Sequence, residues 1–452
     1  MVNWLHKAYW SAFVLWHART EARLPYRPLE EILTMQNRRV QAIIAHAYKT
    51  VPYYREVMDK TGLLPGDFRA GEDLARLPIL TADQLAREPE RFLSRRYMDG
   101  RSLRLHSSGT SGRLRKINYN PAALFLALAH GHRQRLVVAH FVGRKFGYRE
   151  MVSGRPGNIG SQIRQFYESY SWTPKTIEFK RNRLSPGDSF AYNIDRLNEG
   201  QPEVLAGYGS YLGVLFRYAW EHSTPIFQPK ALRYGGDRMT DADRVLIETK
   251  FGVPVLSTYQ AAEALRIAFQ CERREAFHMS LDQIAIRVVD ANGNPVGSGD
   301  TGEIVISNLT NRATVLLNYK LGDVVTLSRT PCPCGRTLPT IERIDGRADD
   351  LLVLPDGRLI HALVVQAPLH RAPGVIQVQL IQEDLRRFVL RVVCASDTDW
   401  QRAQQHLDST MHATFGNDIA LEIERLDTIS PEPGGKIKAV ISYYRAQAVQ
   451  TA

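Results

Sequence analysis

Helical periodicity dominates the first part of the chain. In the stretch LEEILTMQNRRVQAIIAHAYKTV, within residues 28–60, apolar side chains recur every three or four positions, which is typical of a helix with one buried face. Thr81 is expected to cap a second helix, because a threonine hydroxyl can accept from the amides of a first turn. Residues 121–142 predict a third helical stretch with Pro121 in its first turn.

Between residues 203 and 308 the pattern changes to alternation of strands and helices. Short apolar runs that read as strands are EVLAGY, KALRYGG and VPVLSTYQ, and helical patterns lie between them in YLGVLFRYAWEH and TDADRVLIETKF. This order predicts an α/β layout with parallel pairing. The next segment, QIAIRVVDANGNPVGSGDTGEIVISNL, predicts two strands joined by Gly- and Asn-rich turns, so part of the region is antiparallel.

A domain boundary is predicted near RIDGRADDLLVLPDG, where Gly346 and the pair Asp349–Asp350 interrupt the apolar pattern. Beyond it, the segments VIQVQLIQED, RFVLRVVCA, WQRAQQHLDSTMHATF and IALEIERLD read as strand, strand, helix and strand. The predicted organisation is a large α/β domain over residues 1–348 and a small α+β domain over residues 349–452.

Composition and charge restrict the class of protein. The 452 residues are 44% hydrophobic and 23% charged, as expected for a globular protein of two or three domains. The net charge of +11 favours anionic partners, but the basic residues are scattered and form no long tail, so no dedicated nucleic-acid function is expected. Four cysteines are too few for a disulfide framework, and a reducing cytoplasm is the expected location.

The first 20 residues are rich in aromatic side chains. The apolar run from Ala8 to Trp16 is shorter than the roughly 20 residues that span a bilayer, and no small-residue cleavage site follows it. We expect a helix docked on the rest of the protein. Contact with a membrane surface through these residues is the alternative, because the run is aromatic and flanked by basic residues.

The sequence SSGTSG at residues 107–112 predicts a phosphate-binding loop. Glycines let the backbone fold tightly around an anion, and hydroxyls add donors for phosphate oxygens. No Gly-Lys-Ser/Thr follows, which argues against a P-loop NTPase. A polar surface turn is the structural alternative for this stretch taken by itself.

Four further motifs carry groups suited to nucleotide chemistry. Tyr259 follows an apolar strand and can stack on a base, and Glu263 is a carboxylate of the kind that holds Mg²⁺. Asp323 in NYKLGDVV can accept from ribose hydroxyls, and Arg347 in DGRADD can donate to the sugar or a phosphate. Lys436 follows two glycines in PEPGGKIKAV. Each residue also has an ordinary structural explanation, so their order along the chain matters most.

That order resembles the acyl-adenylate-forming superfamily and, within it, the phenylacetate–coenzyme A ligase family, which includes capsule-biosynthesis relatives. The resemblance covers roughly residues 28–441. It implies that Glu263 binds Mg²⁺, that Lys436 contacts the carboxylate and the α-phosphate, and that Asp349 is a hinge. The implied ATP site consists of Ser107, Ser108, Gly109, Thr110, Ser111 and Gly112 at the phosphates, Gly235, Gly236 and Tyr259 around adenine, and Asp323 and Arg347 at the ribose.

Two positions depart from the family pattern. Gln260 stands where the family has glycine, near the implied acyl pocket, and Arg113 stands where the family has lysine after the loop. The proline that follows this lysine in the family is absent as well. An unusual substrate is therefore expected.

Three cysteines and one histidine form a candidate zinc set. Cys332 and Cys334 lie in a tight C-x-C-G knuckle, and Cys271 and His278 lie about 60 residues earlier. A Cys₃His set is suited to structural Zn²⁺ with no open position for substrate. Some members of the family carry a zinc with this pattern. Reduced cysteines buried beside a surface histidine are the alternative.

The function implied by the resemblance is ATP-dependent adenylation of a carboxylic acid, aryl or arylacetic in this family, followed by transfer to coenzyme A. An amine or a sugar as acceptor, or no acceptor beyond AMP, is the first alternative. A non-enzymatic zinc-stapled binding protein is the second, and the run of nucleotide motifs argues against it. The identity of the acid stays open, as does the oligomeric state, with a homodimer among the options.

Overall fold

The computed structural model describes residues 4–98, 100, 102–108, 114–154, 158–172, 181–347, 351–354, 359–361, 365, 368–369, 372–430 and 438–444. The chain divides into two compact units. The first consists of Met1–Gly147, Pro156–Phe179 and Ser257–Asp345, and the second of Tyr148–Arg155, Lys180–Leu256 and Gly346–Ala452.

Helices form the amino-terminal part of the first unit. The predicted helix over 28–60 is two helices, because Pro52 has no amide hydrogen to continue the first one and instead begins the second. Thr81 caps α4 as predicted, its hydroxyl accepting from the Gln84 amide at 3.3 Å. The helices are α1 (Trp4–Glu21), α2 (Leu29–Thr50), α3 (Pro52–Thr61), α4 (Ala82–Arg87), α5 (Pro121–His130), α6 (His132–Val142) and α7 (Ile159–Tyr170).

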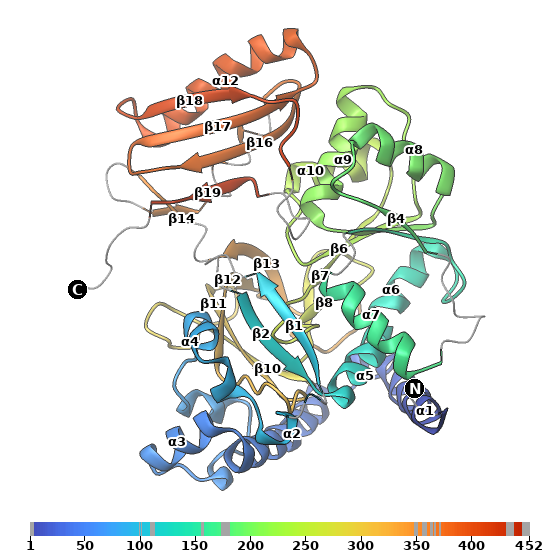
Figure 1. The fold of residues 1–452 in the computed structure, drawn as a ribbon, viewed down its shortest axis with the longest axis vertical. Helices are drawn as coiled ribbons and strands as arrows, with labels where there is room; N and C mark the ends of the chain where they lie inside the picture. Colours follow the sequence, from blue (N-terminus) through green and yellow to red (C-terminus); the bar gives the residue numbers. More distant parts are fainter. Residues whose placement is uncertain are drawn as a thin grey trace. The chain divides into compact units, whose positions relative to one another are not determined.

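The strands of the first unit form a hairpin and a larger, mostly antiparallel sheet (Figure 1). The hairpin pairs β1 (Leu103–Ser108) with β2 (Leu114–Tyr119). The larger sheet follows the order β10-β11-β12-β13-β9-β8-β7. Its strands are β7 (Val255–Tyr259), β8 (Ala268–Gln270), β9 (Phe277–Met279), β10 (Ile284–Val289), β11 (Thr301–Asn308), β12 (Tyr319–Leu327) and β13 (Thr340–Arg347).

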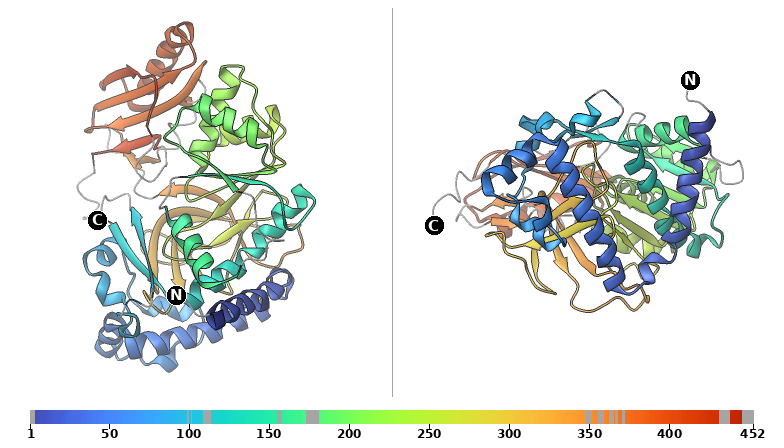
Figure 2. Two further views of the ribbon diagram at one scale, coloured as in Figure 1. Left: turned by 45° about the vertical axis from the view of Figure 1, so that its right-hand side comes forward. Right: turned by 90° about the horizontal axis from the view of Figure 1, so that it is seen from below.

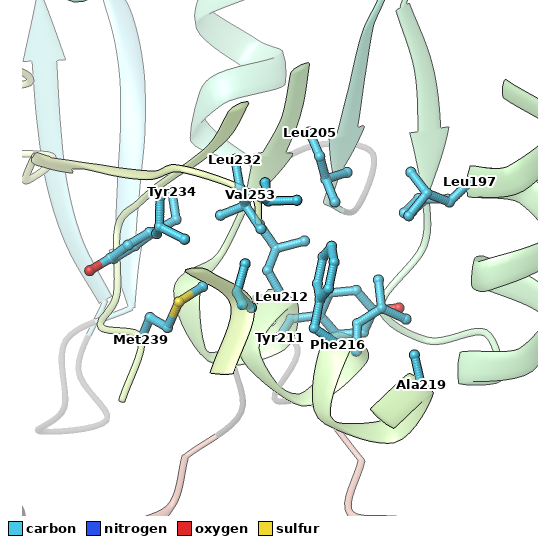
Figure 3. Packing of buried hydrophobic residues seen from close by; sticks show 14 of the residues in the cluster. Leu197, Leu205, Tyr211, Leu212, Phe216, Ala219, Leu232, Tyr234, Met239 and Val253 are labelled. Carbon is cyan, nitrogen blue, oxygen red and sulfur yellow. The ribbon is translucent and has the colours of Figure 1, made fainter. Parts of the chain in front are cut away.

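The second unit contains parallel strands, of which the alternating pattern predicted β5 and β6 but not β3 and β4. They follow the order β6-β5-β3-β4, and the β3–β4, β3–β5 and β5–β6 pairs are parallel. Leu205, Leu212, Phe216 and Leu232 belong to the apolar core between these strands and their helices (Figure 3). The elements are β3 (Glu150–Ser153), β4 (Arg181–Leu184), β5 (Val204–Gly207), β6 (Ala231–Gly235), α8 (Phe190–Gly200), α9 (Gly209–Glu221) and α10 (Asp241–Lys250).

The carboxy-terminal part of the second unit has the predicted strand, strand, helix, strand order. A sheet of order β18-β17-β16-β19 packs against α12, with Leu390 and Leu407 in its core. A short β14–β15 pair precedes it. The elements are β14 (Leu351–Val353), β15 (Leu359–His361), β16 (Val375–Gln382), β17 (Arg387–Cys394), α12 (Asp397–Phe415), β18 (Ala420–Arg425) and β19 (Val440–Ser442).

The mixed α/β fold class is thus confirmed. A second predicted helix is also divided: the helix predicted over 121–142 is interrupted at Gly131, where an added Cβ would lie 2.8 Å from a guanidinium nitrogen of Arg266. The predicted domain boundary at 348/349 lies outside the described residues. Among the helices that are described, none combines the length and apolarity that crossing a bilayer requires.

Candidate functional site

Tyr259 and Asp323, predicted from separate motifs, meet in the first unit. Tyr259 is the last residue of β7, and Asp323 lies in β12. The Tyr259 hydroxyl donates to Asp323 Oδ2 at 2.5 Å. Tyr259 is buried, whereas Asp323 remains partly accessible. An aromatic ring and a carboxylate that can accept from hydroxyl groups therefore lie side by side.

Glu263 belongs to a second polar cluster in the same unit. Its Oε1 lies 3.0 Å from Arg115 Nη1 and 3.4 Å from the Tyr319 hydroxyl. Arg115 Nη1 also donates to the Tyr319 hydroxyl at 2.8 Å. All three side chains are buried, so the negative charge of Glu263 is compensated mainly by one guanidinium.

The predicted phosphate loop leaves the hairpin next to this cluster. Ser107 and Ser108 end β1 and pair with Arg115 and Leu114 at the start of β2. Since Arg115 contacts Glu263, the start of β2 is connected to the predicted Mg²⁺ ligand. Positions 109–112 lie outside the described residues, as do the side chains of Ser107 and Ser108.

Three other predicted residues also fall outside the description. Asp349 and Lys436 are not among the described residues, and of Arg347 the backbone at the end of β13 is described but not the side chain. The predicted Gly235 and Gly236 belong to the second unit, at the end of β6. Gly236 has φ +85°, where a side chain would be strained, and an added Cβ would lie 3.3 Å from the Tyr208 ring.

Gln260, the residue after Tyr259, lines a small cavity. The cavity volume is about 10 Å³, which is room for about one water molecule. Gln134 and Arg266 also line it. The buried Nε2 of Gln134 has no hydrogen-bond partner among the described residues, and the Arg266 guanidinium donates to Gln134 Oε1 at 3.5 Å and to the Ala127 carbonyl at 3.1 Å.

The four residues of the candidate zinc set come together. The ligand atoms of Cys271, His278, Cys332 and Cys334 all lie within 4.8 Å of one another. Cys271 Sγ is 3.7 Å from Cys332 Sγ, and His278 Nε2 is 3.4 Å from Cys334 Sγ. In a tetrahedral zinc site with bonds of about 2.0–2.3 Å, ligand atoms are about 3.4–3.8 Å apart. The donor types and both distances fit this ion.

Burial and neighbouring groups shift the pKa values of Cys271, His278 and Cys334. Burial, reinforced by the two neighbouring sulfur atoms, raises the pKa of Cys271 to about 12. Burial lowers the pKa of His278 to about 4, so its imidazole is neutral, as a metal ligand must be. Although burial alone raises the pKa of Cys334, hydrogen bonds from the main chain and side chain of Arg336 lower it overall.

A second layer of contacts holds this cluster. Arg336 forms two hydrogen bonds to Glu272, at 2.7 and 2.8 Å, and so connects the residue after Cys271 with the C-x-C-G knuckle. Partners of this kind orient metal ligands in many sites.

Sequence reasoning did not find Arg115, Tyr319 or Arg336. Arg115 was visible only as one of several basic residues behind the loop, and the tyrosine of the NYKLGD motif was not separated from its aspartate. The signal for Arg336 was its position immediately after the knuckle glycine.

Comparison with known proteins gives the same family that the motifs resemble. Residues 352–443 match the CapK C-terminal domain. The chain is 28% identical to a phenylacetate-coenzyme A ligase of Thermus thermophilus over 77% of both chains. It is 22% identical to Protein CapK of Staphylococcus aureus over 92% of this chain and 90% of that protein.

The fold is shared with a solved acyl-activating enzyme. A 2-hydroxyisobutyryl-CoA ligase in the postadenylation state, in complex with R3-HIB-AMP, matches 93% of this chain and 91% of its own length with a TM-score of 0.75 and 18% identity. The same ligase in complex with 2-HIB-AMP and CoA, in the thioesterification state, matches with a TM-score of 0.59. The chain therefore has the fold of the acyl-adenylate-forming ligases, and the predicted resemblance to phenylacetate–coenzyme A ligases and CapK is confirmed.

Proposed function

We propose that the protein activates a carboxylic acid with ATP and transfers the acyl group to coenzyme A. In the first step a carboxylate oxygen attacks the α-phosphorus of ATP and pyrophosphate leaves, which gives an acyl adenylate. In the second step the thiol of coenzyme A attacks the acyl carbon, its proton is lost, and AMP leaves with the bonding electrons. The acid is expected to be aryl or arylacetic, as the names of the phenylacetate-coenzyme A ligase relatives suggest.

The pairing of Tyr259 with Asp323 carries this proposal. Two motifs 64 residues apart supply an aromatic ring and a carboxylate in hydrogen-bond contact. The ring would stack on adenine, and the carboxylate would accept from the ribose hydroxyls. Glu263 lies in the same unit and offers the hard oxygen ligand that Mg²⁺ prefers. A carboxylate has two oxygens, so Glu263 can hold a cation through one while Arg115 contacts the other.

Lys436 is proposed to stabilise the first step. The attacking carboxylate and the α-phosphate are both anionic, so positioning and positive charge are what a protein can contribute. The glycine-flanked lysine would supply this charge from the small domain, residues 349–452, with Asp349 as the hinge. The match of residues 352–443 to a separate domain family supports that boundary.

Zinc is proposed as a structural ion at Cys271, His278, Cys332 and Cys334. The donor set, the ligand distances and the hydrogen bonds from Arg336 support it. The ion would hold the C-x-C-G knuckle against the β8–β9 turn and would take no part in the reaction.

An acyl acceptor other than coenzyme A is the second candidate. The similarity to CapK extends over 92% of this chain, further than the 77% matched by the Thermus ligase. A capsule-type relative would pass the acyl group to an amine or a sugar. The two functions differ in whether AMP release requires coenzyme A.

Pyrophosphate release over a panel of aryl, fatty and hydroxy acids, each with and without coenzyme A, tests the proposal. Lys436→Ala should lower adenylation roughly 10²–10³-fold, because a preorganised charge is lost, and should leave ATP binding nearly intact. The exposed Lys60→Ala, on α3, is the matched control and should behave as the unaltered protein. Wild-type pyrophosphate exchange in Lys436→Ala would refute the role of this lysine.

A further inference from the structure

Helix α1 is docked on the first unit by one of its two faces. Trp10 stacks on Phe125 of α5, with ring centroids 4.5 Å apart and planes at 14°. At the end of the helix, Glu21 Oε2 lies 2.6 Å from Arg133 Nε, and both side chains are buried. Helix α1 packs along α5 and also contacts α6 and α7 (Figure 2).

The outer face of α1 is also apolar, and it is exposed. Helices that are apolar on all sides are normally buried on all sides. The exposed fractions are 65% for Trp4, 55% for Leu5, 58% for Tyr9, 54% for Leu15 and 69% for Trp16. Leu5, Tyr9 and Trp16 lie on one line along the helix, and Trp4 and Leu15 lie on a neighbouring line, so the five side chains form one broad strip.

A further exposed tryptophan follows α7, in a segment that is hydrogen-bonded to α1. The backbone amide of Trp172, just after α7, donates to Ser11 Oγ at 2.9 Å, and its indole is 51% exposed. Contiguous apolar surface of this kind marks an interaction site more often than isolated exposed residues do.

The charges around the strip identify its partner. Glu21 is the single acidic residue of α1 and is buried against Arg133. Lys7 and Arg19 on the helix and Arg23 just after it are basic, in a chain with net charge +11. Tryptophan and tyrosine favour the boundary between lipid headgroups and acyl chains, and basic residues favour anionic headgroups.

We propose that α1 rests on an anionic membrane surface, parallel to the bilayer, with Trp4, Tyr9 and Trp16 inserted at headgroup level. This proposal is independent of the proposed function. A second copy of the chain fits less well, because a two-fold contact between identical strips would bring their basic residues together.

Co-sedimentation of the full chain with vesicles tests this. The protein should pellet with vesicles of phosphatidylglycerol and phosphatidylethanolamine, bind phosphatidylcholine vesicles much more weakly, and be released by salt. The double variant Trp4→Ser/Trp16→Ser should bind the anionic vesicles at least about tenfold more weakly. Leu64→Ser/Val245→Ser, which changes exposed apolar residues on other elements, is the matched control and should bind as the unaltered protein.

Two results would overturn the proposal. One is equal retention of the protein and the Trp4/Trp16 variant by anionic vesicles, or no retention of either. The other is a dimer in solution that the Trp4/Trp16 variant converts to a monomer while vesicle binding is absent, which would assign the strip to a second copy. Circular dichroism and pyrophosphate release of the variants show that they are folded.

Discussion

At the scale of residues, Glu263 illustrates what a motif omits. The sequence motif identifies a carboxylate that suits Mg²⁺, and the structure adds the buried guanidinium of Arg115 at 3.0 Å. Arg115 arrives from a strand 148 positions earlier, and no spacing rule connects the two. The sequence therefore predicts that Glu263 binds Mg²⁺, but it does not predict that Arg115 is the ion-pair partner of Glu263.

The Arg115–Glu263 pair gives a stability prediction. Arg115→Met or Glu263→Gln alone should lower the free energy of unfolding by about 3–5 kcal/mol, because each leaves one buried charged or polar group without its partner. The double variant should lose less than the sum by at least about 1 kcal/mol. Urea unfolding of the four proteins measures this coupling, and additive losses would show that the two side chains do not interact.

At the scale of elements, the apolar patterns predicted the longer helices and strands that display a clear period, but not β3, α7, β4 and α8 between residues 150 and 200. Two predicted helices are divided in the structure, each at a boundary that a single residue decides. Pro52 ends α2, and Gly131, lying against Arg266, separates α5 from α6. The short strands β8 and β9, three residues each, were not predicted, since three residues are too few to show alternation.

These short strands matter because they connect the ligand pair Cys271 and His278. If zinc holds this turn to the C-x-C-G knuckle, the purified protein should contain about one zinc per chain, and chelation should lower its melting temperature by several degrees. Cys332→Ser should lower the zinc content and the melting temperature in the same way. Cys394→Ser changes the cysteine of β17, outside the cluster, and is the matched control. Full stability of a metal-free protein would contradict a structural role.

At the scale of the whole molecule, several histidines are buried in the neutral form. Burial lowers the pKa of His132 to about 4, with Arg135 and Lys145 adding to the effect, and lowers the pKa of His130 well below its ordinary value. Burial likewise lowers the pKa of His46. In the unfolded chain these side chains bind a proton near pH 6.5, whereas the folded protein binds it only at lower pH.

Acid should therefore destabilise the protein. Between about pH 6.5 and 4 the unfolded state binds more protons than the folded state, so stability that is fully present above pH 6.5 is lost as the pH falls.

His132 is only partly buried, and we assign it about 1 kcal/mol of this loss after allowing for solvent screening. His132→Gln should flatten the dependence of unfolding free energy on pH by that amount, since glutamine does not titrate. Leu64→Ser, which changes an exposed side chain that does not titrate, should leave the dependence unchanged. Urea unfolding at pH 7.5, 6.0 and 5.0 measures all three proteins, and a pH dependence that is the same in His132→Gln as in the unaltered protein would show that this histidine is not held neutral by the fold.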